Sequence, residues 1–451
     1  MTDAALRALA AELSDGALVT DPDVVEGYRH DRATTVRAGA PLALVRASNT
    51  ADVQATLRIA SAHSIPVVPR GAGTGLSGGS SAIDGAITLS TERMRAITVD
   101  PQAMVAVVQP GLLNAEVKAA AHEHGLWYPP DPSSFEICSI GGNLATNAGG
   151  LCCVKYGVTT DYVLGLEAVL ADGRAVRLGG QTIKDVAGYD LKRLFVGSEG
   201  TLGVITEATL RLRPLPPPAT TIIGTFAHVV AAGRAVAAVV ADVRPAALEL
   251  MDAAAVAAVE AVRPMGLDPS IGALLLAQVD GSPSEAGTVS ACFQAAGATY
   301  VAVSDDAEEG ELLMGARRMA IPCVERLGTV LIEDVSVPIP RIPELVAAVV
   351  AIAVRHATAI PVIGHAGDGN LHPLVTFDAA DPDATARAEA AFDDVMDAAL
   401  ALGGTVTGEH GIGTLKARHL ARQLGPDVMA MTRAVKAALD PAGILNPGKW
   451  V

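Results

Sequence analysis

The chain has 451 residues, half of them apolar but only 3% aromatic, and a formal net charge of −16 at pH 7. One hydrophobic core rarely serves more than about 250–300 residues, so we expect two or three domains. The acidic balance argues against non-specific binding to nucleic acid, which requires a positive surface. A local group of basic residues can still collect an anionic ligand.

The five cysteines are Cys138, Cys152, Cys153, Cys292 and Cys323, and no pair has the Cys-x-x-Cys spacing. This pattern excludes the usual iron–sulfur and zinc-ribbon sites and fits a reducing compartment. The N-terminus shows no secretory signal, and no apolar run approaches the roughly 20 residues that cross a bilayer. We therefore predict a cytoplasmic protein and leave peripheral contact with a membrane open.

The first half of the chain predicts short helices and strands around glycine-rich loops. In chain order, we expect a helix over 4–13, a strand near 41–45, a helix over 49–64 capped by Ser48, Asn49 or Thr50, strands over 65–69 and 86–90, and a hairpin over 163–178. The hairpin turns at Asp172-Gly173. Pro214 to Pro218 interrupt the pattern and mark the best domain boundary.

Glycine and serine fill residues 70–81, which read Arg-Gly-Ala-Gly-Thr-Gly-Leu-Ser-Gly-Gly-Ser-Ser. Gly73, Gly75 and Gly78 match the G-x-G-x-x-G dinucleotide fingerprint, but that fingerprint needs a helix opening at its last glycine. A polar turn and the strand at 86–90 leave no room for the helix, so we reject a Rossmann domain. The backbone N–H groups of the loop, with the charge of Arg70, suit a diphosphate instead.

Two further glycine-rich stretches follow at 138–150 and 188–206. Each lets the backbone approach something flat or charged closely. Three such stretches in one region indicate one large, extended ligand rather than three small ones.

Beyond residue 218 the pattern changes to alternating strands and helices. The spacing predicts strands at 220–226, 247–251, 273–279, 300–303 and 329–337, and helices at 228–240, 253–262, 285–296 and 308–327, the last interrupted near Pro322. Strands at 359–363 and 371–377 flank a turn, a helix follows over 383–402, and a short strand over 405–407 and a closing helix over 433–439 complete the order.

Two glycine-rich turns in this second half carry three histidines and a glutamate. Residues 364–372 read Gly-His-Ala-Gly-Asp-Gly-Asn-Leu-His, and residues 408–411 read Gly-Glu-His-Gly. His365, His372 and Glu409 form a plausible set of two nitrogens and one oxygen for a divalent metal. His410 remains for proton transfer, because imidazole titrates near neutral pH. Ordinary surface turns are the alternative interpretation.

Together these motifs resemble a known family. They are residues 69–79, 140–150, 197–206 (Gly-Ser-Glu-Gly-Thr-Leu-Gly-Val-Ile-Thr), 364–372, 408–411 and 446–448 (Asn-Pro-Gly), in this order. The chain resembles the FAD-linked D-2-hydroxyacid dehydrogenases, a family that includes D-lactate dehydrogenases and the FAD subunit of glycolate oxidase. That family belongs to the vanillyl-alcohol oxidase/p-cresol methylhydroxylase flavoproteins, and the resemblance covers nearly the whole chain.

The resemblance implies an α+β fold. We expect an N-terminal helical segment (1–36), a two-subdomain FAD-binding domain of the p-cresol methylhydroxylase (PCMH) type (37–215), and an α/β substrate-binding cap domain with an antiparallel sheet (219–410). A C-terminal segment (411–451) would return to the FAD domain.

The resemblance also implies a set of FAD contacts. They fall on Arg70, Gly71, Ala72, Gly73, Thr74, Gly75, Leu76, Ser77 and Gly78 for the diphosphate, and on Pro130, Ser139, Gly142, Thr146, Gly149, Glu199, Gly203, Val204, Ile205 and Asn446 for the remainder of the cofactor. Some relatives attach FAD through a histidine in the first glycine loop. Residues 70–81 contain none, so we expect non-covalent FAD.

For the reaction, the resemblance implies that His365, His372 and Glu409 hold a divalent metal, with zinc as the expected ion, and that His410 is the base. Arg317 is the candidate for the substrate carboxylate, with a solvated helix face as the alternative. Members specific for 2-hydroxyglutarate add a Thr and a Lys downstream, where this chain has Ile321 and Ile332. A shorter or more apolar 2-hydroxyacid is therefore favoured, oxidised to the 2-oxoacid by hydride transfer to FAD.

Electrons would leave through a separate acceptor, which is an electron-transfer protein, a quinone or oxygen, because the chain lacks iron–sulfur cysteines. The oligomeric state stays open, with a homodimer as one option. Two other functions are kept: a non-catalytic FAD-binding partner subunit of a glycolate-oxidase-like complex, and a metal-dependent hydrolase without flavin. The three glycine stretches oppose the hydrolase, and a base beside a metal set opposes the non-catalytic subunit.

Overall fold

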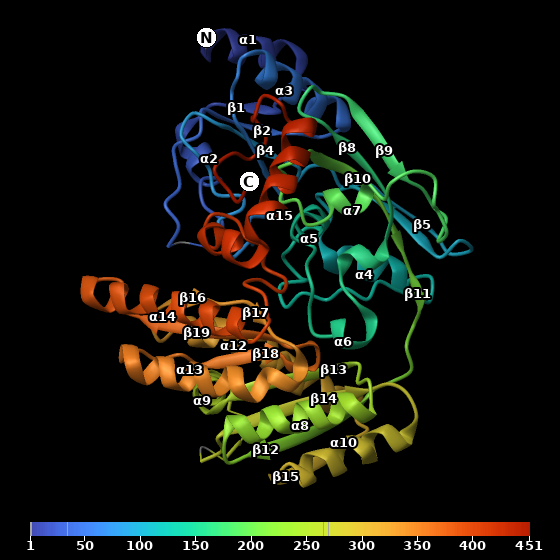
Figure 1. Cartoon of the computed structure of the whole chain (residues 1–451). Helices are drawn as coiled ribbons and strands as arrows, with labels where there is room; N and C mark the ends of the chain where they lie inside the picture. The colour runs from blue at the N-terminus through green and yellow to red at the C-terminus, as the bar shows by residue number, and fades with distance from the viewer. Residues whose placement is uncertain (1, 34, 265, 269) are drawn as a thin grey trace. The chain divides into compact units, whose positions relative to one another are not determined.

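The computed structural model describes residues 2–33, 35–264, 266–268 and 270–451. The chain divides into two compact units, each built from more than one segment (Figure 1). The first unit contains Met1–Gly149, Val158–Leu215 and Glu409–Val451, and the second contains Gly150–Gly157 and Pro216–Gly408.

A four-stranded sheet opens the first unit, with strand order β1-β2-β4-β3. The strands are β1 (Leu18–Val19), β2 (Ala43–Arg46), β3 (Val67–Arg70) and β4 (Ile87–Ser90), and the accompanying helices are α1 (Thr2–Glu12), α2 (Pro22–Glu26) and α3 (Thr50–Ala62). Of the three proposed caps, Asn49 is the one that caps α3: its side chain accepts a hydrogen bond from the Asp52 N–H at 3.0 Å.

The connection between β3 and β4 decides against a Rossmann domain. These two consecutive strands pair in parallel, and parallel neighbours in a Rossmann unit are joined through a helix. Residues 71–86 are all described and contain only turns, bends and irregular backbone. The rejection of the dinucleotide fingerprint is confirmed, and the glycine-rich loop starts where β3 ends.

The second sheet of this unit is antiparallel, with order β5-β6-β10-β8-β9. Its strands are β5 (Ile97–Asp100), β6 (Val105–Val108), β8 (Val163–Val169), β9 (Ala175–Gly179) and β10 (Val204–Arg211). Nearby elements are α4 (Asn114–His122), β7 (Leu126–Trp127), α5 (Ile140–Thr146), η1 (Thr159–Tyr162), α7 (Lys192–Phe195) and β11 (Arg213–Pro214). The hairpin predicted over 163–178 is confirmed as β8 and β9.

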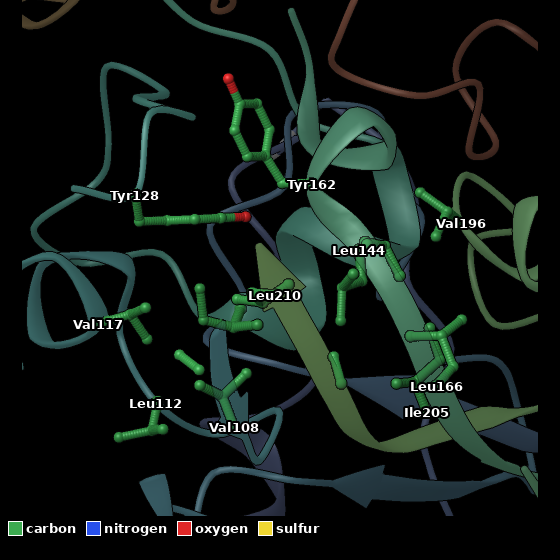
Figure 2. Packing of buried hydrophobic residues seen from close by; sticks show 14 of the residues in the cluster. Val108, Leu112, Val117, Tyr128, Leu144, Tyr162, Leu166, Val196, Ile205 and Leu210 are labelled. Carbon is green, nitrogen blue, oxygen red and sulfur yellow. The ribbon is translucent and has the colours of Figure 1, made fainter. Parts of the chain in front are cut away.

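A hydrophobic core beside this sheet fixes α5 (Figure 2). Leu144 of α5 is fully buried in one cluster with Val117 of α4 and Leu210 of β10. The Tyr128 and Tyr162 rings meet edge to face with centroids 6.0 Å apart. Because the apolar side chains anchor α5 firmly, its N-terminus, which carries Ser139 and Gly142, has a defined position.

The C-terminal segment joins the first sheet. The Val67 N–H donates to the Ile444 carbonyl at 2.8 Å, and Leu445 is fully buried in the core beneath the sheet. The helix before it, α15 (Ala417–Leu439), starts well before the predicted residue 433. A kink at Gly425-Pro426 divides α15 into two helical parts, and Gly425 at the kink has a non-helical φ of 76°.

An eight-stranded sheet forms the second unit, in the order β15-β12-β14-β13-β18-β19-β16 with β17 paired to β19, and all its pairs are antiparallel. Its strands are β12 (Thr220–Phe226), β13 (Ala247–Asp252), β14 (Ala273–Val279), β15 (Ala298–Ser304), β16 (Thr329–Ile332), β17 (Val335–Ser336), β18 (Val362–His365) and β19 (Asn370–Phe377).

Helices α8 (Val229–Asp242), α10 (Pro283–Ala295), α13 (Ile342–His356) and α14 (Pro382–Ala401) pack side by side over this sheet (Figure 1). The remaining elements are α6 (Cys153–Tyr156), α9 (Ala253–Val262), α11 (Ala307–Arg318), α12 (Ala320–Glu325), η2 (Ile339–Arg341) and η3 (Ala366–Asp368). The α+β class with an antiparallel cap-type sheet is confirmed.

Two strand predictions in this unit are wrong, and one helix interruption lies a few residues from its predicted place. Thr405–Thr407 is not a strand, and only an isolated bridge pairs Thr405 with Ser336. The helical stretch over 308–327 is interrupted as expected, but at Met319 rather than at Pro322, which lies in the first turn of α12, where a helix tolerates proline. The strand predicted over 329–337 is instead two short strands, β16 and β17, with Glu333 and Asp334 between them.

Candidate functional site

The glycine-rich loop after β3 presents a run of backbone donors. Gly73 and Gly78 have φ of 74° and 77°, which favour glycine. Among the described residues, no protein acceptor is recorded for the N–H groups of 73–79. Successive N–H groups of this kind form a concave anion site. The loop therefore fits a diphosphate group.

Ser139 ties this loop to α5. Its Oγ accepts from the Ala72 N–H at 3.1 Å and, as the N-cap of the helix, from the Gly142 N–H at 3.3 Å. Gly71 has no space for a side chain, because an added Cβ would lie 2.4 Å from Ser139 Oγ. Arg70 is buried and donates to the His30 carbonyl at 2.8 Å. The predicted diphosphate residues and the predicted α5 residues thus form one neighbourhood.

Asn446 joins the C-terminal segment to the same neighbourhood. Its buried side-chain amide donates to the Gly79 carbonyl at 2.9 Å and to the Glu199 carbonyl at 2.8 Å. Asn446 and Glu199 both adopt positive φ, 43° and 51°. Left-handed backbone at residues other than glycine is uncommon and clusters at functional sites.

The Glu199 side chain holds the segment that follows His410. Its two carboxylate oxygens accept from the Ile412 N–H at 2.7 Å and the Gly413 N–H at 2.8 Å. Ser77 Oγ donates to the Gly411 carbonyl at 2.8 Å. The chain after His410 is therefore fixed by one residue of the glycine loop and one of the 197–206 motif.

Glu199 gives a pH-dependent prediction. Burial raises the pKa of the Glu199 carboxyl to about 7, opposed by the Ile412 and Gly413 N–H groups and by Lys416 and Lys449. A raised pKa in the folded state means that the contribution to stability is complete below the ordinary pKa near 4.3 and is lost as pH rises through about 7. Between pH 5 and 8 the wild-type free energy of unfolding should fall by about 2–3 kcal/mol relative to Glu199→Gln.

Urea unfolding of both proteins at pH 5, 6, 7 and 8 measures this difference. The Gln variant is the matched control because its side chain has the same shape and does not titrate. A stability difference that stays constant across the range would contradict the assignment.

The other predicted FAD residues surround the same region. Thr146 Oγ1 donates to the Gly142 carbonyl at 3.2 Å within α5, and the Pro130 carbonyl accepts from the Asn114 amide at 3.2 Å. Val204 and Ile205 open β10, and Gly203 precedes them where an added Cβ would lie 2.8 Å from the Phe195 ring. Gly149 is buried at the end of the first segment of this unit. These residues fit a large cofactor with a diphosphate.

The second unit brings the two motif histidines together. His365 ends β18, and His372 is the third residue of β19 and pairs with Ile363. Ile363 and its partner His372 point to the same face of the hairpin, and so does His365, which is two residues from Ile363 on the same strand. The two histidine rings therefore share one face, with centroids 5.2 Å apart. His372 therefore lies inside a strand rather than at its end.

Both histidines are held through Nδ1. His365 Nδ1 lies 3.0 Å from both carboxylate oxygens of Glu249, and His372 Nδ1 lies 3.2 Å from the Glu333 carbonyl. A carboxylate or carbonyl only accepts, so each Nδ1 carries the proton and each Nε2 is the nitrogen that can serve as a metal ligand. Both rings are buried. The pair fits a divalent metal that accepts imidazole nitrogen, such as zinc.

Asp334 organises the segment that leads to Glu409. Its carboxylate accepts from the Asn370 amide at 3.0 Å, from Thr407 Oγ1 at 2.6 Å and from the Gly408 N–H at 3.0 Å. It also lies 3.7 Å from His372 Nδ1. The residue before Glu409 is thus anchored beside the strand that carries His372.

Glu409 and His410 are grouped with the first unit. His410 Nε2 lies 3.7 Å from a carboxylate oxygen of Glu409. Their roles as metal ligand and base stay predictions.

Arg317 is buried, with a side chain 2% exposed, so the solvated helix face is wrong. It lies in α11, and its Nη2 forms an ion pair with Glu249 Oε2 at 2.9 Å. The same carboxylate therefore contacts both Arg317 and His365.

Sequence reasoning missed Glu249 and Asp334. The available signal was a carboxylate inside an otherwise apolar strand, as in Ala-Leu-Glu-Leu-Met-Asp at 247–252.

No helix within the described ranges has both the length and the apolar character to span a membrane.

Comparisons with known proteins agree with this arrangement. A family model described as "FAD linked oxidases, C-terminal domain" matches residues 215–450, and one described as "FAD binding domain" matches residues 41–179. Glycolate oxidase subunit GlcD of Bacillus subtilis is 42% identical, covering 94% of this chain and 91% of the relative. D-lactate dehydrogenase of Archaeoglobus fulgidus is 38% identical, covering 94% and 96%.

Among solved structures, p-cresol methylhydroxylase with substrate bound matches with a TM-score of 0.81 at 19% identity, covering 99% of this chain and 96% of that chain. This likeness shows the PCMH-type fold. The chain belongs to the family of FAD-linked oxidases and is a FAD-dependent oxidoreductase related to glycolate oxidase and D-lactate dehydrogenase.

Proposed function

We propose that this protein oxidises a short 2-hydroxyacid, of the D-lactate or glycolate type, to the 2-oxoacid with non-covalent FAD and a divalent metal. The observation that supports the proposal is the buried His365–His372 pair, in which both Nδ1 atoms are held, so that Nε2 of each ring is the nitrogen that can serve as a metal ligand. Bound FAD would supply an acceptor for the hydride from C2, and a metal held by His365 and His372 would supply the positive charge that makes the substrate hydroxyl more acidic.

The chain's own residues supply the remaining parts. Glu409 would complete the metal set with the two histidines, and His410 would take the hydroxyl proton. Arg317 would contact the substrate carboxylate, a task for which its planar guanidinium is well suited. The resemblance to the family implies that Ile321 and Ile332 take the places of the Thr and Lys of the 2-hydroxyglutarate-specific members, which supports a short side chain on the hydroxyacid.

FAD is expected to be released by denaturation, because residues 70–81 contain no histidine that could form a covalent link. Since the relative from Bacillus subtilis is named as a subunit, we expect a separate partner to receive the electrons. The family assignment favours this catalytic role over a flavin-free hydrolase or a non-catalytic subunit.

Turnover with an artificial dye acceptor tests the substrate class. D-lactate, L-lactate, glycolate and D-2-hydroxyglutarate are supplied separately, and the 2-oxoacid is identified as a hydrazone. We expect D-lactate or glycolate to be turned over at least about tenfold faster, as kcat/KM, than D-2-hydroxyglutarate, because the isoleucines Ile321 and Ile332 offer no polar partner to a second carboxylate. Preference for D-2-hydroxyglutarate would contradict the short-substrate assignment.

A further inference from the structure

Glu249 lies at the centre of a buried charged group in the second unit. Its side chain is fully buried in the middle of β13, between the fully buried Leu248 and Leu250. One carboxylate contacts His365 Nδ1 at 3.0 Å through both oxygens and Arg317 Nη2 at 2.9 Å. It therefore bridges the candidate metal ligand and the candidate substrate arginine.

The charges explain why such a carboxylate can be buried at all. Burying an isolated carboxylate in an apolar strand destabilises the fold strongly unless a cation and hydrogen-bond donors surround it. Arg317 supplies the positive charge and the His365 Nδ1–H supplies a donor. Conversely, a carboxylate at Nδ1 fixes the imidazole orientation and makes Nε2 a stronger ligand.

We propose that Glu249 is a positioning residue that sets His365 as a metal ligand and ties it to Arg317, so that metal affinity depends on this buried carboxylate. The inference rests on the proposed function, because it requires that His365 bind a metal. The inference goes beyond the proposed function because it assigns a role to Glu249, a residue outside both glycine-rich histidine motifs.

A purely structural ion pair makes a different prediction. If Glu249 and Arg317 only held β13 against α11, loss of the carboxylate would lower stability and leave the metal affinity of the folded protein unchanged. If Glu249 positions His365, metal affinity falls even where folding and FAD content are preserved. Metal affinity measured without substrate therefore separates the two roles.

The experiment measures the zinc dissociation constant of the FAD-loaded protein by competition with a chromogenic chelator. Glu249→Gln keeps the shape and removes the charge, and we expect the dissociation constant to rise about 10–100-fold. Glu249→Asp keeps the charge but shortens the side chain, so it is a second variant if the Gln protein does not fold. It should also bind zinc more weakly than wild type.

Asp280→Asn is the matched control. Asp280 is also a buried carboxylate of the second unit, with an ion pair to Lys155 at 2.5 Å and a hydrogen bond from the Tyr156 hydroxyl. Within the described residues no contact between Asp280 and either motif histidine is recorded. This variant should bind zinc as the wild type does.

His365→Ala distinguishes failure of this inference from failure of the proposed function. If His365→Ala loses zinc while both Glu249 variants bind within threefold of wild type, the positioning role is overturned and the metal site stands. If wild type and His365→Ala bind zinc equally, or neither binds it, the metal site itself is overturned and the inference with it.

Discussion

Replacing His410 with alanine is expected to leave FAD bound but to slow anaerobic flavin reduction by at least about 10²-fold, the range typical of a lost general base. The backbone around this position should persist, because Ser77 and Glu199 hold the Gly411 carbonyl and the Ile412 and Gly413 N–H groups rather than the imidazole. Rapid mixing with saturating substrate, followed through the flavin absorbance, measures the rate.

His356→Ala is the matched control. His356 lies in α13 and pairs with Asp394 at 2.7 Å, outside the candidate site. Its flavin reduction should match wild type. Reduction at the wild-type rate in His410→Ala would refute the assignment of His410 as the base.

Replacing His372 with alanine is expected to remove the metal and, with it, most of the flavin reduction. In the proposed site His372 would supply one of two imidazole ligands, and the two remaining ligands would hold a divalent ion weakly compared with three. FAD content should be unchanged, since the candidate FAD residues all belong to the other unit. The measurement is the metal content after dialysis, determined by plasma mass spectrometry. It is expressed per bound FAD, and the FAD content is the internal control for correct folding.

A His372→Ala protein that retains one metal ion per FAD would contradict the ligand assignment. A protein that loses the metal but keeps the wild-type rate of flavin reduction would show that hydride transfer to FAD does not require the metal.

The parts of the site that the sequence predicted are those in which one short stretch carries both the backbone geometry and the functional side chain. Gly73 and Gly78 adopt positive φ where the glycine pattern required a tight turn. His365 and His372 share one face because the hairpin register follows from the short Gly-Asp-Gly connection. Local spacing is sufficient for such features.

Glu249 was not found because its function depends on pairing between distant segments. It lies 116 residues before His365, and the two meet only because β13 pairs with β18, which sets Leu250 opposite Gly364. Arg317 reaches the same carboxylate from a third element, α11. The hydrophobic periodicity of one segment cannot predict a contact between residues of three separate elements. A buried acidic residue in an apolar strand indicates only that some partner exists.

The same limit explains the wrong local predictions. Thr405 to Thr407 have strand-type side chains, yet the Thr407 hydroxyl and the Gly408 N–H bond to the Asp334 carboxylate, and this tertiary contact replaces a regular strand ladder. The contacts of Asp334 thus account for the absence of a regular strand at 405–407 and for the defined backbone position of Gly408, the residue before Glu409.

The visible spectrum of the purified protein during anaerobic addition of D-lactate or glycolate tests the central claim most directly. We expect a yellow protein whose flavin absorbance bleaches on addition of one of these acids, in wild type and in the Asp280→Asn control. Yellow protein that no 2-hydroxyacid bleaches would contradict the proposed reaction while leaving the FAD fold in place.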